Sequence, residues 1–513
     1  MYEEIIDAES HYPAEPGAGC FSPEIAGDPA DPNLYPIDPE KEDEEPPSLE
    51  YQDGHIKGLV YFPYFFRSWS TRARAPIVVM AHGNHNPADP SYRGYKYFQI
   101  QLARIGIIAV SVDCNALNGR AGGVKNIEDR ADLIIDNIKY FQGLDQDPNS
   151  VFFEKIDFTN LGLMGHSRGG DAVVMIPEVP IQDVIIKAVL ALAPTNFRYW
   201  DGLPTIRPQG YAFMTILPAA DGDVWANNGA QFYDQAIPGP YKSQVYAHNA
   251  NHNFFNREWL HDDSISAMPH GPLFSRYDHE CILSAFGCAL FRTSLLGENL
   301  TDFISGSMLA ASVQNRSIFL SFEKDEALTV DNHEDNNAID INSLGHPTSQ
   351  IDGMVAGEYE FERVPGAYNS SFYGQSVGMV AEKGPQNRIF RTQLPAPSDL
   401  IEKDVWIRAA EVTDGKSVPV GATGFQLGLE DVNGNRSWVD SNDIGGGLPR
   451  PYQRKPGTIK TMLNTLYFKS DCFEQKMGPD LKNVQAILVR CNRNDDREFA
   501  FDDLQIVERR YQS

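Results

Sequence analysis

The stretch Leu161-Gly-Leu-Met-Gly165-His166-Ser167-Arg168-Gly169-Gly170 places a short apolar run directly before a Gly-x-Ser-x-Gly motif, and a helix-compatible segment, 171–176, follows at once. This order predicts a strand, a tight turn and a helix, which is the setting of a nucleophile elbow. Such a turn strains the backbone of its serine, and a side chain at Gly165 or Gly169 would collide with the neighbouring strand or helix. The stretch therefore predicts a nucleophilic Ser167, with an ordinary glycine-rich turn as the alternative.

Apolar runs on both sides of this motif alternate with segments of helical spacing. Upstream, strands are expected at 58–63, 77–81 and 107–112, and helices at 95–105 and 127–144. Downstream, strands are expected at 186–192, 211–217 and 244–247, and a long helix at 277–296. Strands that are apolar throughout imply a parallel sheet covered on both faces. The expected fold class is therefore α/β, with a mostly parallel sheet flanked by helices.

The two ends of the chain differ from this central part. Residues 1–54 are rich in Pro, Asp and Glu, which predicts an acidic arm with little core of its own. Residues 55–313 hold the α/β pattern. From 314 to 513, short β-type runs such as 317–322 and 499–506 are separated by turn residues. These runs predict a C-terminal antiparallel β-sandwich.

The length and charge of the chain indicate how many domains to expect and which partners to exclude. A chain of 513 residues is too long for one ordinary core. Its net charge of -27, from 70 acidic and 43 basic side chains, would repel nucleic acid and anionic membrane surfaces, so no nucleic-acid partner is expected. No apolar run reaches about 18 residues, so no membrane span is expected. The N-terminus lacks a secretory pattern, which favours a cytoplasmic protein over a secreted one whose leader has been removed.

No metal or cofactor is expected, because the six cysteines are scattered and no His-Glu-x-x-His pattern occurs. Cys472 and Cys491 could pair, although thiols are expected in a chain without a secretion signal. The stretch Asp431-Val-Asn433-Gly-Asn435 partly matches a calcium loop. Its glycine is two positions early and the distal Glu is missing, so a hairpin turn is expected there instead.

An acid and a base follow the later strands, as a serine nucleophile requires. Asp221 and Asp223 come directly after the strand at 211–217, and we expect Asp221 to orient the base, with Asp223 as the alternative. Beyond the strand at 244–247 we expect His252 to be the base, with His248 as the alternative. Without a catalytic role, these acids would cap a turn and these histidines would be structural.

Two backbone N–H groups are expected to stabilise an oxyanion. One belongs to Arg168, directly after the nucleophile. The other belongs to Asn84, in the loop His82-Gly83-Asn84-His85-Asn86, where Gly83 lets the backbone approach a ligand. Taken alone, this loop would be read as a polar turn containing a glycine.

Aromatic residues in neighbouring loops are expected to line an apolar substrate pocket. The candidates for substrate contact are Trp225, Phe254 and Phe255, with Phe197, Tyr199 and Trp200 nearby in the sequence. Ordinary packing explains these residues equally well.

The stretch His82-Gly-Asn-His, the elbow 165–170 and the loop Asn251-His-Asn-Phe-Phe together resemble the α/β-hydrolase family. They look like the branch that contains chlorophyllase, platelet-activating-factor acetylhydrolase and cutinase-like polyester hydrolases. The resemblance covers roughly residues 55–300 and implies a Ser-His-Asp serine esterase that needs no metal. The acidic arm and the β region lie outside it, so the substrate is not carried over. The ending Phe499-Ala-Phe-Asp-Asp-Leu is similar to the last strand of jelly-roll, carbohydrate-binding-like modules.

The function expected from these residues is hydrolysis of a carboxylic ester or lactone through an acyl-enzyme. One alternative is an amidase or peptidase that uses the same residues. Another is a glycan- or polymer-binding protein whose hydrolase domain is inactive. The β region could bind a polymer surface, or it could form a homo-oligomer interface or rim the active site. The missing leader favours the second role.

Overall fold

The computed structural model describes residues 24–26, 45–64, 74–264, 272–314, 316–334, 339–360, 370–372, 376–382, 384–412, 424–444, 447–448, 451–455, 458–474, 478–492 and 498–509. Cys20 and most of the acidic arm lie outside these ranges. Across the described ranges, no helix is both long and apolar enough to cross a membrane.

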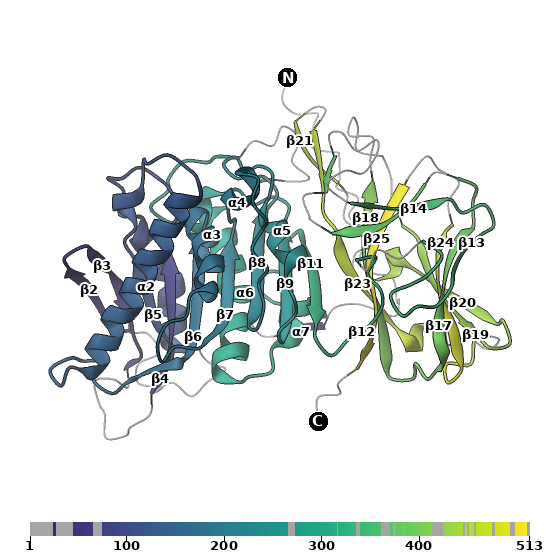
Figure 1. Ribbon diagram of the computed structural model, residues 1–513, viewed down its shortest axis with the longest axis horizontal. Coiled ribbons are helices and arrows are strands. Elements are labelled where there is room, and N and C mark those ends of the chain that lie inside the picture. The colour runs from purple at the N-terminus through teal and green to yellow at the C-terminus, as the bar shows by residue number, and fades with distance from the viewer. Residues whose placement is uncertain are drawn as a thin grey trace.

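A nine-stranded mixed sheet forms the N-terminal part of the molecule (Figure 1). Its strands are β2 (Ser48–Asp53), β3 (Ile56–Tyr61), β4 (Ala75–Ala81), β5 (Ile108–Val112), β6 (Ile156–His166), β7 (Ile186–Leu192), β8 (Ala212–Pro218), β9 (Tyr241–Ala247) and β11 (Ile318–Lys324). They lie in the order β2-β3-β5-β4-β6-β7-β8-β9-β11. Neighbours from β5 to β9 are parallel, and the pairs at both edges are antiparallel. The strand order reverses at β4, and in such sheets this is where a crevice opens at the carboxyl ends of the strands.

Helices cover both faces of this sheet because neighbouring residues of its buried strands point in opposite directions. Val78 and Met80 pack in one core with α1 (Lys96–Arg104) and α6 (Arg276–Phe291). Ile77 and Val79 pack in another with α2 (Val124–Gln146), α3 (Arg168–Met175) and α5 (Gly229–Gln235). The expected alternation of strands and helices is therefore confirmed.

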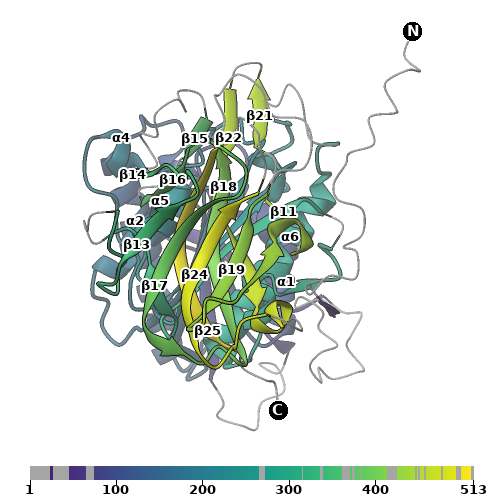
Figure 2. The ribbon, with the colours of Figure 1, turned by 90° about the vertical axis from the view of Figure 1, so that its right-hand side faces the viewer.

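Two antiparallel sheets form most of the C-terminal region (Figure 2). One contains β12 (Leu328–Asp331), β14 (Ala356–Glu360), β16 (Val377–Ala381), β18 (Lys403–Val412), β23 (Asn464–Lys469) and β25 (Glu498–Glu508). The other contains β13 (Thr348–Ile351), β17 (Arg388–Ser398), β19 (Gln426–Asp431), β20 (Arg436–Asp440) and β24 (Val484–Cys491). The sheets face each other, since the ring of Phe425, next to β19, lies 4.9 Å from that of Phe501 in β25. The expected antiparallel sandwich is present.

Two small sheets complete the described structure. The strands β15 (Ser370–Phe372), β21 (Tyr452–Lys455) and β22 (Thr458–Thr461) form a three-stranded sheet. The strand β1 (Glu24–Ala26) runs parallel to β10 (Met308–Ala310), which brings part of the N-terminal arm beside a segment about 280 residues later in the chain.

Two strands correct the boundaries expected from the sequence. Residues 48–53, expected in the acidic arm, form the edge strand β2 and pair with β3. Residues 318–324, expected in the β region, form β11 and pair with β9. The two parts also share a core, because the rings of Phe322 in β11 and Trp406 in β18 lie 5.7 Å apart.

Two smaller expectations are met in the C-terminal region. The Asp431 carboxylate accepts hydrogen bonds from the N–H groups of Asn433 and Asn435 inside the β19–β20 hairpin, so this loop is the expected turn. Cys472 and Cys491 are separate thiols.

The crossing of α3 over β6 and β4 requires glycine. A Cβ on Gly165 would lie 2.0 Å from the carbonyl oxygen of Gly169. We predict that Gly165→Ala lowers the free energy of unfolding by about 3 kcal/mol, measured by urea denaturation. The matched control is Gly143→Ala in α2, where nothing lies within 4 Å and alanine should stabilise the helix by about 1 kcal/mol. Equal stability of Gly165→Ala and wild type would contradict this account.

Candidate active site

Ser167 occupies the turn between β6 and α3 in a backbone conformation that side chains rarely adopt, with φ 59° and ψ -124°. Its N–H donates to the carbonyl oxygen of Leu192 at 2.9 Å, and its own carbonyl oxygen accepts from the N–H groups of Asp171 and Thr195. These bonds hold a strained residue in place, as expected of a functional turn. The side chain is almost fully buried, with 1% exposed.

His252 and Asp221 form a buried pair at the carboxyl ends of the neighbouring strands β9 and β8. The Nδ1–H group of His252 donates to Oδ2 of Asp221 at 2.8 Å. The other carboxylate oxygen of Asp221 accepts from the N–H groups of Asp223 at 2.9 Å and Val224 at 2.7 Å. Because both carboxylate oxygens are engaged, the carboxylate is fixed and holds the imidazole with Nε2 as its second, outward nitrogen.

The pair determines how His252 titrates. Burial alone would lower the pKa of His252, but the charge of Asp221 and its hydrogen bond outweigh burial, and Asp223 and Asp263 add to them. Together they raise the pKa of His252 to about 9. The protonated imidazole is therefore the stable form at neutral pH.

The His252 ring lies beside the elbow. Its centroid is 4.7 Å from that of His166, the residue directly before Ser167. Among the described residues, Nε2 of His252 is buried and has no hydrogen-bond partner, so it is not bonded to the Ser167 hydroxyl in this structure. Such bonds are often long or poorly aligned before a substrate binds.

The two alternative residues occupy different positions. Oδ2 of Asp223 lies 3.6 Å from Nε2 of His252, on the side away from Asp221, and its side chain is 63% exposed. His248 is buried at the end of β9 and packs against Phe319 and Tyr452. The geometry therefore joins Asp221 to His252, as the sequence predicted, and leaves His248 in a packing position.

The loop after β4 lies directly against Ser167. A Cβ on Gly83 would come within 2.4 Å of Cβ of Ser167 and 2.9 Å of its Oγ, so only glycine fits there. Arg130, which is buried in α2, donates to the carbonyl oxygen of His82 at 2.9 Å and so holds this loop in place. The side chain of Asn84 accepts from the N–H of Gly119 at 2.9 Å. The predicted donor loop and nucleophile are thus adjacent.

Arg168 begins α3, and the first N–H groups of a helix have no partner within it. Its guanidinium points elsewhere, since it donates to the carbonyl oxygen of Arg120 at 3.1 Å and lies over the ring of Phe197. The guanidinium of Arg168 therefore lies away from Ser167, and the part of Arg168 that is next to Ser167 is its backbone N–H group.

The aromatic candidates differ in exposure. Trp225 is 46% exposed, and Phe254 is half-buried beneath the guanidinium of Arg276. Phe255 is fully buried and packs against His279 and His166, so it belongs to the core that supports the His252 loop.

Trp259 was not singled out from the sequence. It is fully buried, its Nε1–H donates to Ser91 Oγ at 2.9 Å, and its ring lies against those of three histidines. The ring centroids of His166, His85 and His252 are 4.7, 5.0 and 6.0 Å from it. Trp259 therefore supports the histidines around the elbow, and no local motif marks this role.

Asp263 joins the loops that carry Asp221 and His252, and it was also missed. One carboxylate oxygen accepts from the N–H of Gly222, next to Asp221, at 2.9 Å. The other accepts from the N–H of Asn253, next to His252, at 2.9 Å. This residue fixes the spacing of Asp221 and His252, and only the folded structure reveals it, because the loop around Asp263 carries no motif.

The C-terminal region contacts the loop that carries Asp221, called the acid loop below, through Lys460 of β22. Its buried ammonium donates to the carbonyl oxygen of Ala219 and to Oδ1 of Asn227, both at 2.9 Å. Asn227 in turn donates to the carbonyl oxygen of Pro218 at 2.8 Å. These bonds hold both ends of the loop that carries Asp221. The β region therefore contacts the loop that carries Asp221.

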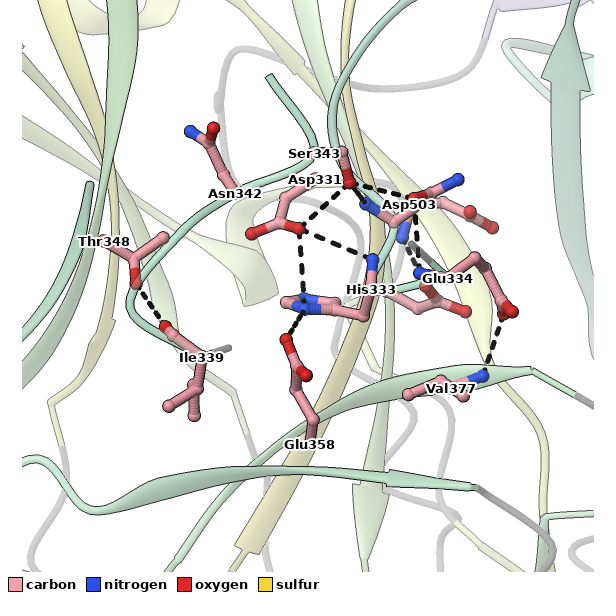
Figure 3. A network of polar contacts seen from close by, with 12 residues as sticks. Asp331, His333, Glu334, Ile339, Asn342, Ser343, Thr348, Glu358, Val377 and Asp503 are labelled. Atoms are coloured by element: carbon pink, nitrogen blue, oxygen red, sulfur yellow. Dashed lines mark hydrogen bonds and ion pairs between the residues drawn. The ribbon is translucent and has the colours of Figure 1, made fainter. Parts of the chain in front are cut away.

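A second histidine with acidic neighbours lies inside the sandwich (Figure 3). Nδ1 of His333 is 3.1 Å from Oε1 of Glu358 and 3.5 Å from Oδ1 of Asp331, and Ser343 donates to the same Asp331 oxygen. Burial would lower the pKa of His333, but its bond to Glu358 and the charge of Asp331 raise it. These contacts describe an internal ion pair.

No protein-family model matches the chain, and no curated protein matches it.

The pKa of His252 gives a stability prediction. A folded-state pKa of about 9 against an ordinary 6.5 means that protonation stabilises the fold. This contribution is fully present below pH 6.5 and is lost as the pH rises through about 9, and it amounts to about 3 kcal/mol. Urea unfolding of wild type and His252→Gln should therefore give a stability difference about 3 kcal/mol larger at pH 6 than at pH 10. A difference that is constant with pH would show that the pKa is not raised.

Lys460 gives a second prediction. Lys460→Met leaves two buried oxygens without their donor, so it should lower the free energy of unfolding by about 3 kcal/mol. Lys139→Met, on the exposed surface of α2, should change it by less than about 0.5 kcal/mol. Equal effects of the two substitutions in urea denaturation would mean that Lys460 does not hold the acid loop.

Proposed function

We propose that the chain is a serine hydrolase of the α/β-hydrolase type that cleaves a carboxylic ester or lactone. The observation that carries the proposal is the buried hydrogen bond between His252 and Asp221, beside a serine in a strained strand-to-helix turn. The strand order, with a parallel centre and the elbow at the carboxyl end of β6, also supports it. The sequence resemblance to α/β-hydrolases points the same way.

Each residue has a defined role in the proposed reaction. The neutral Nε2 of His252 takes the proton of Ser167 as Oγ attacks the substrate carbonyl, and Asp221 stabilises the imidazolium that forms. The N–H groups of Asn84 and Arg168 stabilise the tetrahedral oxyanion, each contributing about 3 kcal/mol. The imidazolium then protonates the leaving alcohol. A water molecule, deprotonated by the same histidine, releases the acyl group and restores Ser167.

The reaction needs the unprotonated form of His252. Because the pKa of His252 is raised to about 9, turnover should increase with pH through that value. Asp223 is one cause of the raised pKa, so the variant Asp223→Asn should shift the inflection to lower pH.

The proposal predicts the ranking of four variants with p-nitrophenyl butyrate as substrate. Ser167→Ala and His252→Ala should lower kcat by about 10⁴-fold or more, and Asp221→Asn by about 10⁴-fold. Asp223→Asn is the matched acid-to-amide control, and it should change kcat by less than about tenfold because Asp223 does not bond to Nδ1. A greater loss in Asp223→Asn than in Asp221→Asn would assign the acid role to Asp223.

Assays with p-nitroanilides separate ester from amide hydrolysis. Turnover of the anilide without turnover of the ester would replace the proposed esterase by an amidase. Ester turnover that survives in Ser167→Ala would overturn the serine mechanism.

A further inference from the structure

A cavity of about 660 Å³ lies at the junction of the nine-stranded sheet and the sandwich. Tyr241 at the start of β9 and residues of α7 (Thr301–Ser305) line one side, and Trp406 of β18 and Tyr467 of β23 line the other. His252 follows the opposite end of β9, and a strand of seven residues spans roughly 20 Å. The cavity therefore lies at the amino end of β9, and Ser167 lies at the carboxyl ends of the strands, on the opposite side of the sheet. Its volume is typical of small-molecule sites.

Four buried aromatic rings pack against one another along the floor of the cavity. The ring centroids of Tyr241 and Phe322 are 5.7 Å apart, those of Phe322 and Trp406 are 5.7 Å apart, and those of Trp406 and Tyr467 are 5.0 Å apart. This floor, Tyr241, Phe322, Trp406 and Tyr467, comes from both parts of the molecule. These residues are almost fully buried, with 2% to 8% exposed, and the Phe322–Trp406 and Trp406–Tyr467 pairs meet edge to face.

The walls are polar and carry both signs of charge. The lining includes the hydroxyls of Thr301, Ser305 and Ser307, together with five carboxylates and three cationic side chains. One of these cations, Arg509, is bonded to the lining carboxylate of Asp404 at 2.9 Å. The ammonium of Lys324 lies 5.6 Å from the Trp406 ring centroid, which is the position that a ligand cation would seek.

We propose that this junction cavity binds a neutral, polyhydroxylated ligand of the size of a short oligosaccharide. An anion would meet five carboxylates, and an organic cation would have to displace Lys324 from Trp406. A ligand with many hydroxyls can donate to the carboxylates and accept from the ammonium groups that line the cavity. This inference is independent of the proposed hydrolysis, because it uses other residues at the opposite edge of the sheet.

The test is binding of neutral glycans to the full chain. An array of neutral glycans identifies binders, and isothermal titration calorimetry with maltotetraose, cellotetraose, xylotetraose and chitotetraose measures them. We expect at least one to bind with one site per chain and a Kd below about 1 mM. Ser167→Ala should bind as wild type does, which separates this site from the proposed active site.

Three variants place the ligand in the cavity. Thr301→Trp fills the space from the α7 side without removing a core residue, and it should abolish binding. Trp406→Phe keeps an aromatic ring and should weaken binding about fivefold. Trp438→Phe is the matched control, since Trp438 lies in β20 beneath Arg490, outside the cavity lining, and it should leave the Kd unchanged.

The proposal is overturned if no neutral glycan binds, or if binding is unaffected by Thr301→Trp. Binding of tetramethylammonium that Thr301→Trp blocks, without glycan binding, would also overturn it, because the cavity would then select cations.

Discussion

The backbone conformation of Ser167 is the constraint on which the rest of the site depends. Holding a serine at φ 59° costs of order 1–3 kcal/mol, so the surrounding structure must enforce it. Hydrogen bonds from the β7 side and the close packing of α3 over β4 do this, and they leave no room for a side chain at Gly165. The same packing brings the loop at Gly83 against the Ser167 side chain. The strained turn at Ser167 and the close approach of the loop at Gly83 therefore arise from one steric arrangement.

Asp221 and His252, the proposed acid and base, depend on contacts that come from far along the chain. Asp263 spans the loops of Asp221 and His252, and Lys460 reaches the acid loop from a strand more than 230 residues away. Trp259 packs beneath the His252 ring and the elbow. The C-terminal region is thus more than an appended module: it supplies hydrogen bonds to the loop that carries the proposed acid, and it shares a core with the nine-stranded sheet.

Sequence patterns predicted the features that local chemistry controls. The apolar run before Gly165, the glycines around Ser167 and the acid and histidine after successive strands each follow from short-range rules, and the structure places Asp221 and His252 in contact. The patterns misassigned β2 and β11, because β2 is an almost wholly exposed edge strand without an apolar run, and the pairing of β11 with β9 is a long-range contact. Lys460 and Asp263 could not be predicted, since their roles depend on tertiary contacts without a local signal. Phe255, which was expected to line a substrate pocket, is instead a fully buried core residue.

The central claim is that Ser167 is a nucleophile activated by its surroundings, and reaction with a fluorophosphonate tests this most directly. Incubation of the folded chain with the probe, followed by intact mass measurement and peptide mapping, should show one phosphonyl group per chain on Ser167. The label should be absent from Ser167→Ala and from wild type unfolded in urea, because only the folded site positions His252 and the donor groups. A folded wild-type chain that takes up no label, or that is labelled at another residue while Ser167 stays unmodified, would contradict the account.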